Sequence, residues 1–544
     1  MAFLLAQGGS TLYKVDVSTG TATALTLPTG VTLSTTRKPK FAMLNQWVVM
    51  VNSPTNNLLI DPEGIVTTLV PQAPVHPPTL AANTSFTGRT GAYVAAVTFI
   101  VKNSDGDLLV ESPFSPLSAS VTLTDDGLTF SDVAISPDAQ TTGRRVYVSL
   151  AGGDSLADLF HLCDIDDNTT TTFLDTSTDA QITLLTAAVT SLASPPGTLK
   201  GIRLKNVVQW KSRVWGVADD PSLVDSVYAT ETNKVYAWPN VLVAYPTGQS
   251  VNGVVAFAPR KNQLGLLKNN GAWAATAATS STGVAFSNIS VGQIDQSDDK
   301  GCIAEESVVV IGDAAYWLGR NAVYEWTDQG IKDITSDSVK PWFNSDTYFN
   351  RSRFANAFGR YNKVTNSYEL HVAGVGDSTE TRWVSFNLNN RKWYGPHKTG
   401  ALTPSCAASL ADANGLPMTV VGGTDGVIYT GNNANKRDGA ATAIDMDCFG
   451  PWHVGDNPDL MHTWLQLSVL SRIESAGTLD VIPYVGGLDA SAGTTMTHTL
   501  TTGRELLSRL GVGRLSRLRF RKNTVNQSAT IYGYELPWIT NGRR

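Results

Sequence analysis

The sequence has little charge. Lys, Arg, Asp and Glu make up only 16% of its 544 residues, and the formal net charge is −6. A nucleic-acid-binding protein normally has a basic excess, so this composition argues against DNA or RNA binding as the main function. Long exposed helices, which are rich in Glu, Lys and Ala, are also disfavoured.

Cysteine and long apolar runs are also scarce. No stretch approaches the roughly 18 apolar residues of a membrane helix, so no membrane-spanning segment is expected. The apolar start, Met1–Ala6, has no basic residue, and we interpret it as a strand rather than a signal peptide. The cysteines are far apart and show no pairing rhythm, which predicts lone, buried, reduced thiols and folding in a cytosol: Cys163, Cys302, Cys406 and Cys448.

Motifs for catalysis or metal binding are missing as well. The sequence contains no His-x-x-x-His, Cys-x-x-Cys, Gly-x-Ser-x-Gly or phosphate-loop pattern. His371 lies in an alternating segment and is interpreted as a packed or surface histidine rather than a base. We therefore expect no enzymatic activity, no cofactor and no metal. A glycosidase is disfavoured because neither an acid–nucleophile pair nor repeated Asp boxes can be identified.

Two Asp-rich segments have two interpretations each, a functional motif or a turn. Asp125–Phe130 is similar to a sialidase-type Asp box, but it occurs once and is interpreted as a turn. A second segment has oxygen ligands that suit calcium, yet it lacks the bidentate Glu and the Gly of an EF-hand. A hairpin turn is the favoured interpretation of that segment, which contains Asp164, Asp166, Asp167 and Asn168.

What replaces the missing charge is Thr, Ser, Asn and 47 Gly, a composition typical of short strands and tight turns. Strands with aromatic residues and Gly-containing turns recur about every 45–55 residues, the size of a four-stranded propeller blade. This period predicts an all-β fold of the β-propeller type, in preference to a sandwich of unrelated hairpins. The recurring units lie at 207–230, 254–276, 307–326, 368–394 and 419–429.

One segment breaks the rhythm and predicts an inserted fibronectin type III-like β-sandwich. Side chains alternate from Tyr93 to Val101, and the prolines of Ser112–Pro116 block continued sheet pairing. The insert is expected to leave near Pro71 and rejoin near Pro195. The predicted domains are N-terminal propeller strands at 1–76, the insert at 77–182, the main blades at 183–455, and a C-terminal β segment at 456–544 that closes the propeller and contacts neighbours.

Arginine is concentrated near the C-terminus of this acidic chain. In a strand, Arg517, Arg519 and Arg521 project from one face, while Leu518 and Phe520 project from the other. Such a row suits carboxylates of a neighbouring protein, because arginine binds them through two parallel hydrogen bonds. A solvated edge that deters aggregation is the alternative, and DNA binding is the least favoured option. The candidate interface residues are Arg514, Arg517, Arg519 and Arg521.

Three stretches resemble the nozzle or hub proteins of short-tailed bacteriophages. They are Gly8–Val15, Gly301–Trp326, and Val512–Arg521 followed by Ile531–Leu536. The resemblance implies a structural protein of the virion, located in the phage tail and made in the host cytoplasm. It would form a homo-oligomeric ring, expected to be a hexamer, around the DNA ejection channel.

The same resemblance implies the partners of that ring. They are the portal and head-to-tail adaptor, tail fibres or a needle, and genomic DNA that passes without sequence-specific binding. Such a channel should be neutral to acidic, because a conduit must not hold DNA. The alternative is a receptor- or glycan-binding propeller of the tail tip, with the insert contacting the host surface.

Overall fold

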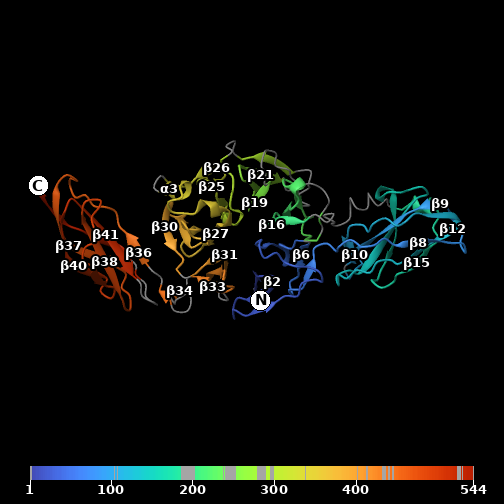
Figure 1. Ribbon diagram of the computed structural model, residues 1–544, viewed down its shortest axis with the longest axis horizontal. Helices are drawn as coiled ribbons and strands as arrows, with labels where there is room; N and C mark the ends of the chain where they lie inside the picture. Colours follow the sequence, from blue (N-terminus) through green and yellow to red (C-terminus); the bar gives the residue numbers. More distant parts are fainter. Residues whose placement is uncertain are drawn as a thin grey trace. The chain divides into compact units, whose positions relative to one another are not determined.

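The computed structural model of the protein is all-β, as predicted, and its strands form many small antiparallel sheets (Figure 1). The α-helices α1 (Asp179–Ile182) and α3 (Lys340–Asn344) are short. Within the described residues, no helix is long and apolar enough to cross a membrane. Almost all residues belong to one of two compact units, Met1–Tyr361 and Asn362–Arg544. The structure describes residues 3–542 except 55, 103, 107, 186–202, 237, 239–252, 278–288, 295–298, 337–338, 401, 412–414, 432–436, 439–441, 444–445, 523–528 and 530.

The first unit contains five small sheets in which neighbouring strands are consecutive in the chain. Tight turns make this possible, as at Asn270-Gly271, where the predicted hairpin joins two strands. The strands of these sheets are β1 (Phe3–Gly8), β2 (Thr11–Asp16) and β3 (Ala22–Ala24); β4 (Lys40–Leu44), β5 (Trp47–Val51), β6 (Asn57–Ile60) and β7 (Val66–Thr68); β16 (Leu204–Trp210), β17 (Arg213–Ala218) and β18 (Val227–Ala229); β19 (Val254–Pro259), β20 (Gln263–Lys268), β21 (Gly271–Ala277) and β22 (Ile289–Gln293); and β23 (Val309–Ile311), β24 (Ala314–Leu318), β25 (Val323–Thr327) and β26 (Gly330–Asp333).

Each of these sheets shares a hydrophobic core with the next one. The cores join β1–β3 to β4–β7, β4–β7 to β16–β18, β16–β18 to β19–β22, and β19–β22 to β23–β26. The first strands also lie next to one another, β4 beside β16, β16 beside β19, and β19 beside β23. The five sheets therefore stack in series, and each buries apolar side chains against its neighbour.

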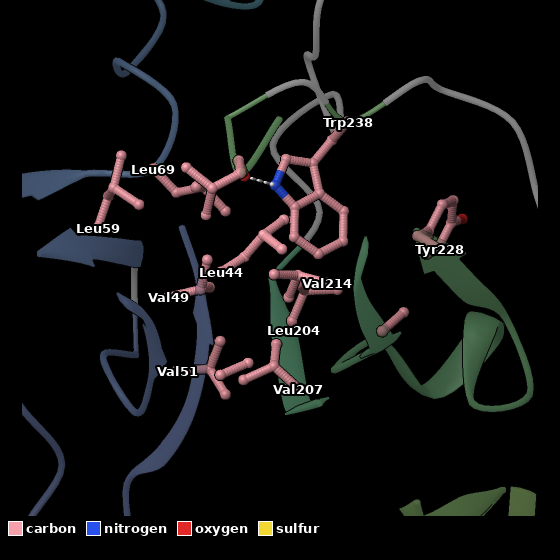
Figure 2. Close-up of a cluster of buried hydrophobic side chains, with 13 residues drawn as sticks. Leu44, Val49, Val51, Leu59, Leu69, Leu204, Val207, Val214, Tyr228 and Trp238 are labelled. Carbon is pink, nitrogen blue, oxygen red and sulfur yellow. Dashed lines mark hydrogen bonds between the residues drawn. The ribbon is translucent and has the colours of Figure 1, made fainter. Parts of the chain in front are cut away.

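The core between β4–β7 and β16–β18 shows how this stacking works (Figure 2). Leu44 and Val49 meet Leu204 and Val214 from the facing sheet, and Trp238 lies among them with its ring fully buried. The Trp238 Nε1 group donates a hydrogen bond to the Val235 carbonyl oxygen at 3.0 Å. Two sheets that are more than a hundred residues apart in sequence thus share one interior.

The residues between these two sheets form a sandwich of their own, hereafter the insert. One sheet has the order β11-β10-β13-β14, and the other contains β15, β12 and β8, with β9 also paired to β12. Their facing side chains make a separate core. The predicted return near Pro195 lies outside the described residues. The strands are β8 (Thr79–Asn83), β9 (Arg89–Tyr93), β10 (Ala95–Lys102), β11 (Leu108–Glu111), β12 (Val121–Ser131), β13 (Gly143–Ser149), β14 (Leu159–Ile165) and β15 (Phe173–Asp175).

The Ser-Pro segment of the insert replaces a strand without forming one. Ser112, Ser115 and Ser118 each donate a backbone N–H to a carbonyl of β10, and each hydroxyl accepts a backbone N–H from the same strand. A spacing of three suits a polyproline II segment, which has three residues per turn. Phe114 and Leu117 of this segment cover the second face of β10, so that strand is buried on both faces.

Both Asp-rich segments differ from the predicted turns. Asp125 lies inside β12, at a β-bulge where this strand stops pairing with β9 and begins pairing with β8. Its φ of 58° is a conformation that Asp tolerates both in bulges and in turns. The second segment connects β14 to β15, which belong to different sheets, so it is not a hairpin. There Asp164 pairs with Arg145, and Asp167 accepts backbone N–H groups from Thr169 and Thr170.

Later in the chain come two more meander sheets, a short two-stranded sheet and a second sandwich. The sequence predicts that residues 456–544 close a propeller. In the structure, β36–β43 form two sheets around one core, and the closing role stays a prediction. The strands are β27 (Phe358–Asn362), β28 (Ser367–Val372), β29 (Arg382–Asn387) and β30 (Lys392–Lys398); β31 (Pro404–Ala411), β32 (Pro417–Gly423) and β33 (Ile428–Gly431); β34 (Arg437–Asp438) and β35 (Thr442–Ala443); β36 (Met446–Phe449), β41 (Leu515–Lys522), β38 (Thr478–Gly486) and β39 (Met496–Thr499); and β40 (Arg504–Gly513), β37 (Met461–Ser471), β42 (Ile531–Glu535) and β43 (Trp538–Gly542).

The four cysteines are free thiols, but the prediction that all are buried is wrong. Cys302 is buried, Cys163 is half-buried, and Cys406 and Cys448 are exposed. Burial raises the pKa of Cys302 to about 12 and that of Cys163 to about 11. These two thiols are therefore protonated and unreactive at neutral pH.

Acidification should destabilise the C-terminal sandwich. Burial lowers the pKa of His498 and of His453 below the ordinary value of 6.5. The folded state therefore keeps both rings neutral where the unfolded chain already binds protons, so stability is complete above pH 6.5 and declines as the pH falls below it. Hydrogen exchange of β37 and β40 between pH 7 and pH 5, corrected for the intrinsic exchange rate, measures this decline.

His498→Gln should flatten part of that pH dependence, whereas His76→Gln, which changes a half-exposed ring just before the insert, should leave it unchanged. An unfolding free energy of the sandwich that is constant from pH 7 to pH 5 would contradict the prediction.

Candidate functional site: an arginine–aromatic face

Strand β41 places the predicted arginines on one face of the C-terminal sandwich. Leu518 and Phe520 are buried in the core, as the alternation predicts. Arg517 and Arg519 are half-buried on the opposite face, and Arg521 is exposed there. Arg514, the fourth predicted residue, lies just before the strand and is exposed.

The neighbouring strands add aromatic and acidic side chains to the same face. On β36, Phe449 is opposite Arg519 and Asp447 is opposite Arg521. On β38, Tyr484 is opposite Arg517. We call this surface, together with Arg514 just before β41, the arginine face, and it comprises Asp447, Phe449, Trp452, Asp480, Tyr484, Arg514, Arg517, Arg519 and Arg521.

Aromatic rings hold two of the guanidinium groups in place. The Arg517 guanidinium lies 4.3 Å from the centre of the Phe449 ring and 5.8 Å from that of Trp452. Its Nε donates to the Gly450 carbonyl oxygen at 2.9 Å. The Arg519 guanidinium lies 5.1 Å from the Phe449 ring. Stacking on rings leaves the hydrogen-bonding edge of a guanidinium accessible while it fixes the plane of the group.

One arginine of the face is already paired with a carboxylate. Arg519 Nε donates to Asp447 Oδ1 at 2.7 Å, and its terminal nitrogen contacts Asp447 Oδ2. This hydrogen bond raises the pKa of Arg519, with a further contribution from Tyr484, and lowers the pKa of Asp447. Both groups therefore remain charged. Because they are partly exposed, the pair contributes at most about 1 kcal/mol to stability.

The composition of this face suits protein recognition. Residues that dominate binding energy at protein interfaces are enriched in Trp, Tyr and Arg. Here three aromatic rings and three arginines of β41 occupy one surface, and Phe449 is 46% exposed on it. A guanidinium group beside an aromatic ring can bind a carboxylate through two parallel hydrogen bonds. The aromatic members could not be found from the arginine motif, since β36 and β41 are about seventy residues apart.

A second charged cluster lies in the first unit, and no sequence motif indicates it. Lys40 Nζ lies 3.2 Å from Glu305 Oε1 and also contacts Glu306. Burial by itself lowers the pKa of Lys40, but the two carboxylates more than offset this and raise it. Burial raises the pKa of Glu305, an effect that Lys40 only partly opposes. The cluster ties β4 to the turn before β23, whose sheet is not next to that of β4 in the series.

His371, the histidine considered as a possible base, is not part of the arginine face. His371 is buried in β28, with its ring stacked 6.3 Å from that of Trp383. Among the described residues, no group of three or more His, Cys, Asp or Glu side chains is arranged to hold a metal ion.

Comparisons with known proteins do not identify a family. No family model and no curated protein matches the chain. Among solved structures, it is similar to the extracellular domain of a hybrid two-component system of B. thetaiotaomicron, at 10% identity and a TM-score of 0.24, over 99% of this chain and 77% of that one. PorZ, a surface component of the type-IX secretion system of Porphyromonas gingivalis, is similar at 10% identity and a TM-score of 0.19, over 80% of this chain and 62% of that one. An exo-β-1,3-galactanase of Phanerochaete chrysosporium is similar at 10% identity and a TM-score of 0.18, over 75% of this chain and 93% of that one.

Proposed function

We propose that this chain is a structural protein of a phage tail, a subunit of the nozzle or hub ring that surrounds the DNA ejection channel. The observation that supports this most is the series of small sheets that share cores with their neighbours and keep their first strands adjacent. We propose that these sheets, together with β27–β33, close into a β-propeller that carries the insert as a fibronectin type III-like sandwich.

A closed propeller suits a part that must withstand the pressure of packaged DNA. Each sheet has a neighbour on both faces, so little apolar surface or strand edge remains exposed. The Lys40 contacts with Glu305 and Glu306 add a polar link between sheets that are not neighbours in the stack. The two sandwiches then provide surfaces for other subunits, the adaptor, and fibres or a needle.

Particle shape tests this proposal. The purified full-length chain is expected to form closed rings with an axial opening, visible by negative-stain electron microscopy and measurable in mass by mass photometry. Monomers over the whole range of salt and concentration would overturn the ring. Spiky trimers that bind host surface glycans would instead support a receptor-binding tail-tip protein.

The assembled ring should bind duplex DNA weakly. The net charge of −6 provides no general basic surface, and each phosphate neutralised by Lys or Arg would slow the passage of DNA. We expect fluorescence-anisotropy titrations with a labelled duplex to show no saturable binding at physiological salt. Tight binding that weakens steeply with added salt would contradict a neutral or acidic channel.

A further inference from the structure

The charge of the chain is distributed very unevenly. Residues 77–182 contain fourteen Asp and Glu but only four Lys and Arg, a net charge of −10, whereas the whole chain carries −6. The remainder of the chain is therefore net positive. The acidic residues of the insert are Asp105, Asp107, Glu111, Asp125, Asp126, Asp132, Asp138, Asp154, Asp158, Asp164, Asp166, Asp167, Asp175 and Asp179.

The four basic residues of the insert are already engaged within it. Arg89 pairs with Asp175, and Arg144 with Asp167. Arg145 pairs with Glu111 and Asp164, while Lys102 pairs with Asp164 and Asp166. The insert therefore has no spare cation to neutralise its remaining carboxylates.

Several of the remaining carboxylates lie around one strand, β9. The Asp125 backbone N–H donates to Thr90 Oγ1 at 3.0 Å, and its carboxylate accepts from the Gly88 N–H at 3.2 Å. The turn that carries Asp154 and Asp158 is bonded to the same strand through Gly152 N–H and the Ala92 carbonyl. In the described part of the chain, no Lys or Arg is within 4.0 Å of these carboxylates. We call this surface the acidic edge, and it comprises Asp125, Asp126, Asp154 and Asp158.

The arginine face has the opposite imbalance. One of its two carboxylates, Asp447, is bound to Arg519. The other, Asp480, acts on Lys522: burial lowers the pKa of Lys522, and Asp480 opposes that shift. Arg514 and Arg521 are exposed, and none of the described carboxylates is within ion-pair distance of either. Among the described residues, Arg517 contacts a carbonyl oxygen and two aromatic rings. The arginine face therefore has more cations than carboxylates.

We propose that the arginine face of one subunit binds the acidic edge of the insert of a second copy of this chain. The proposal rests on the proposed ring, and it names the contact that builds it. The two surfaces are different parts of the chain, so the contact is head-to-tail, and repetition of such a contact closes into a ring when the rotation permits. Guanidinium groups facing carboxylates that have no Lys or Arg beside them provide the complementarity that such an interface needs.

Charge reversal on each surface tests the contact in the full-length chain. One variant carries Arg514→Glu and Arg521→Glu, and the other carries Asp125→Lys and Asp154→Lys. Each variant alone should assemble at least about tenfold more weakly than the wild type, because like charges then face each other. An equimolar mixture of the two should assemble again, because both of its contacts join opposite charges. Mass photometry at 50 and 300 mM salt measures assembly.

The control variant also reverses two arginine charges, but at positions elsewhere on the C-terminal sandwich. Arg472→Glu with Arg509→Glu alters two exposed residues outside the arginine face and should assemble like the wild type. If the lysine variant does not fold, Asp125→Asn with Asp154→Asn replaces it, because Asn tolerates the φ of 58° at residue 125. This neutral pair should weaken assembly by a smaller factor.

The outcomes separate this contact from the ring itself. If the wild type forms rings and the reversed variants do too, the contact is wrong and the ring stands. If the folded variants fail singly and the mixture also fails, the contact is wrong as well. If each variant fails alone and the mixture assembles, but the particles are open chains instead of closed rings, the contact is supported and the ring is overturned. A wild type that stays monomeric at low salt overturns both.

Discussion

Trp238→Ala is expected to lower the free energy of unfolding of the Met1–Tyr361 unit by about 3–5 kcal/mol, the usual cost of truncating a large buried aromatic side chain. Trp238 is fully buried between β4–β7 and β16–β18. Both walls of the resulting cavity are hydrogen-bonded sheets, so the cavity cannot easily collapse. The change also leaves the Val235 carbonyl oxygen without the indole N–H that binds it.

Hydrogen exchange of β5 and β17 under increasing urea measures this loss at the two sheets that face the cavity. The matched control is Trp538→Ala, which truncates a tryptophan that is 40% exposed and should cost under about 1.5 kcal/mol. Protection of β5 and β17 that is unchanged in Trp238→Ala would show that the two sheets do not depend on their common core.

The strands could be predicted where the signal is local. The Asn270-Gly271 pair joins β20 to β21, as a two-residue hairpin predicts, and the aromatic segment at 307–326 contains β23, β24 and all of β25 except its last residue. In both places the turn residues and the strand residues are adjacent in the chain. The predicted alternation of Leu518 and Phe520 against the arginines is confirmed for the same reason.

The predictions failed where the same local sequence fits two structures. Asp125-Asp126-Gly127 has turn residues, but the partner strands make it a β-bulge in β12. The prolines of Ser112–Pro116 end the strand, as predicted, because β11 stops at Glu111. What the sequence did not show is that the serine hydroxyl groups bond this segment to β10, so that β10 is buried on both faces.

Contacts between distant segments could not be predicted from a single sequence. Lys40 and Glu305 are far apart in the chain, and nothing near either residue indicates its partner. Likewise, the arginine motif indicated a charged face but not that Phe449 and Trp452 stack on it. The side of β41 on which the arginines lie could be predicted from the sequence, whereas the contacts that hold their guanidinium groups could not.

Asp175→Ala is expected to destabilise the insert by about 3–5 kcal/mol, because it leaves a buried guanidinium without its carboxylate. The side chains of Arg89 and Asp175 are only 1% and 7% exposed, and the two form an ion pair. Asp175 Oδ1 also accepts hydrogen bonds from the Ser177 N–H at 3.0 Å and the Ser177 hydroxyl at 2.7 Å. In the variant, Arg89 would keep its bond to the Ser177 carbonyl oxygen but would lose its ion-pair partner.

The double variant Arg89→Met with Asp175→Leu should recover most of this loss, since replacing a buried ion pair by apolar groups of similar volume is often close to neutral. Asp166→Ala is the matched control in the same insert, because its carboxylate is 73% exposed and its ion pair with Lys102 contributes about 1 kcal/mol or less. Hydrogen exchange of β8 and β12 reports on the insert, while β20 and β21 report on the stacked sheets. If the insert folds around its own core, Asp175→Ala accelerates exchange in the first pair of strands and leaves the second pair unchanged. Equal acceleration in both would mean that the insert and the sheets unfold together, and a double variant as unstable as Asp175→Ala would place the cost in lost hydrogen bonds rather than in the unpaired charge.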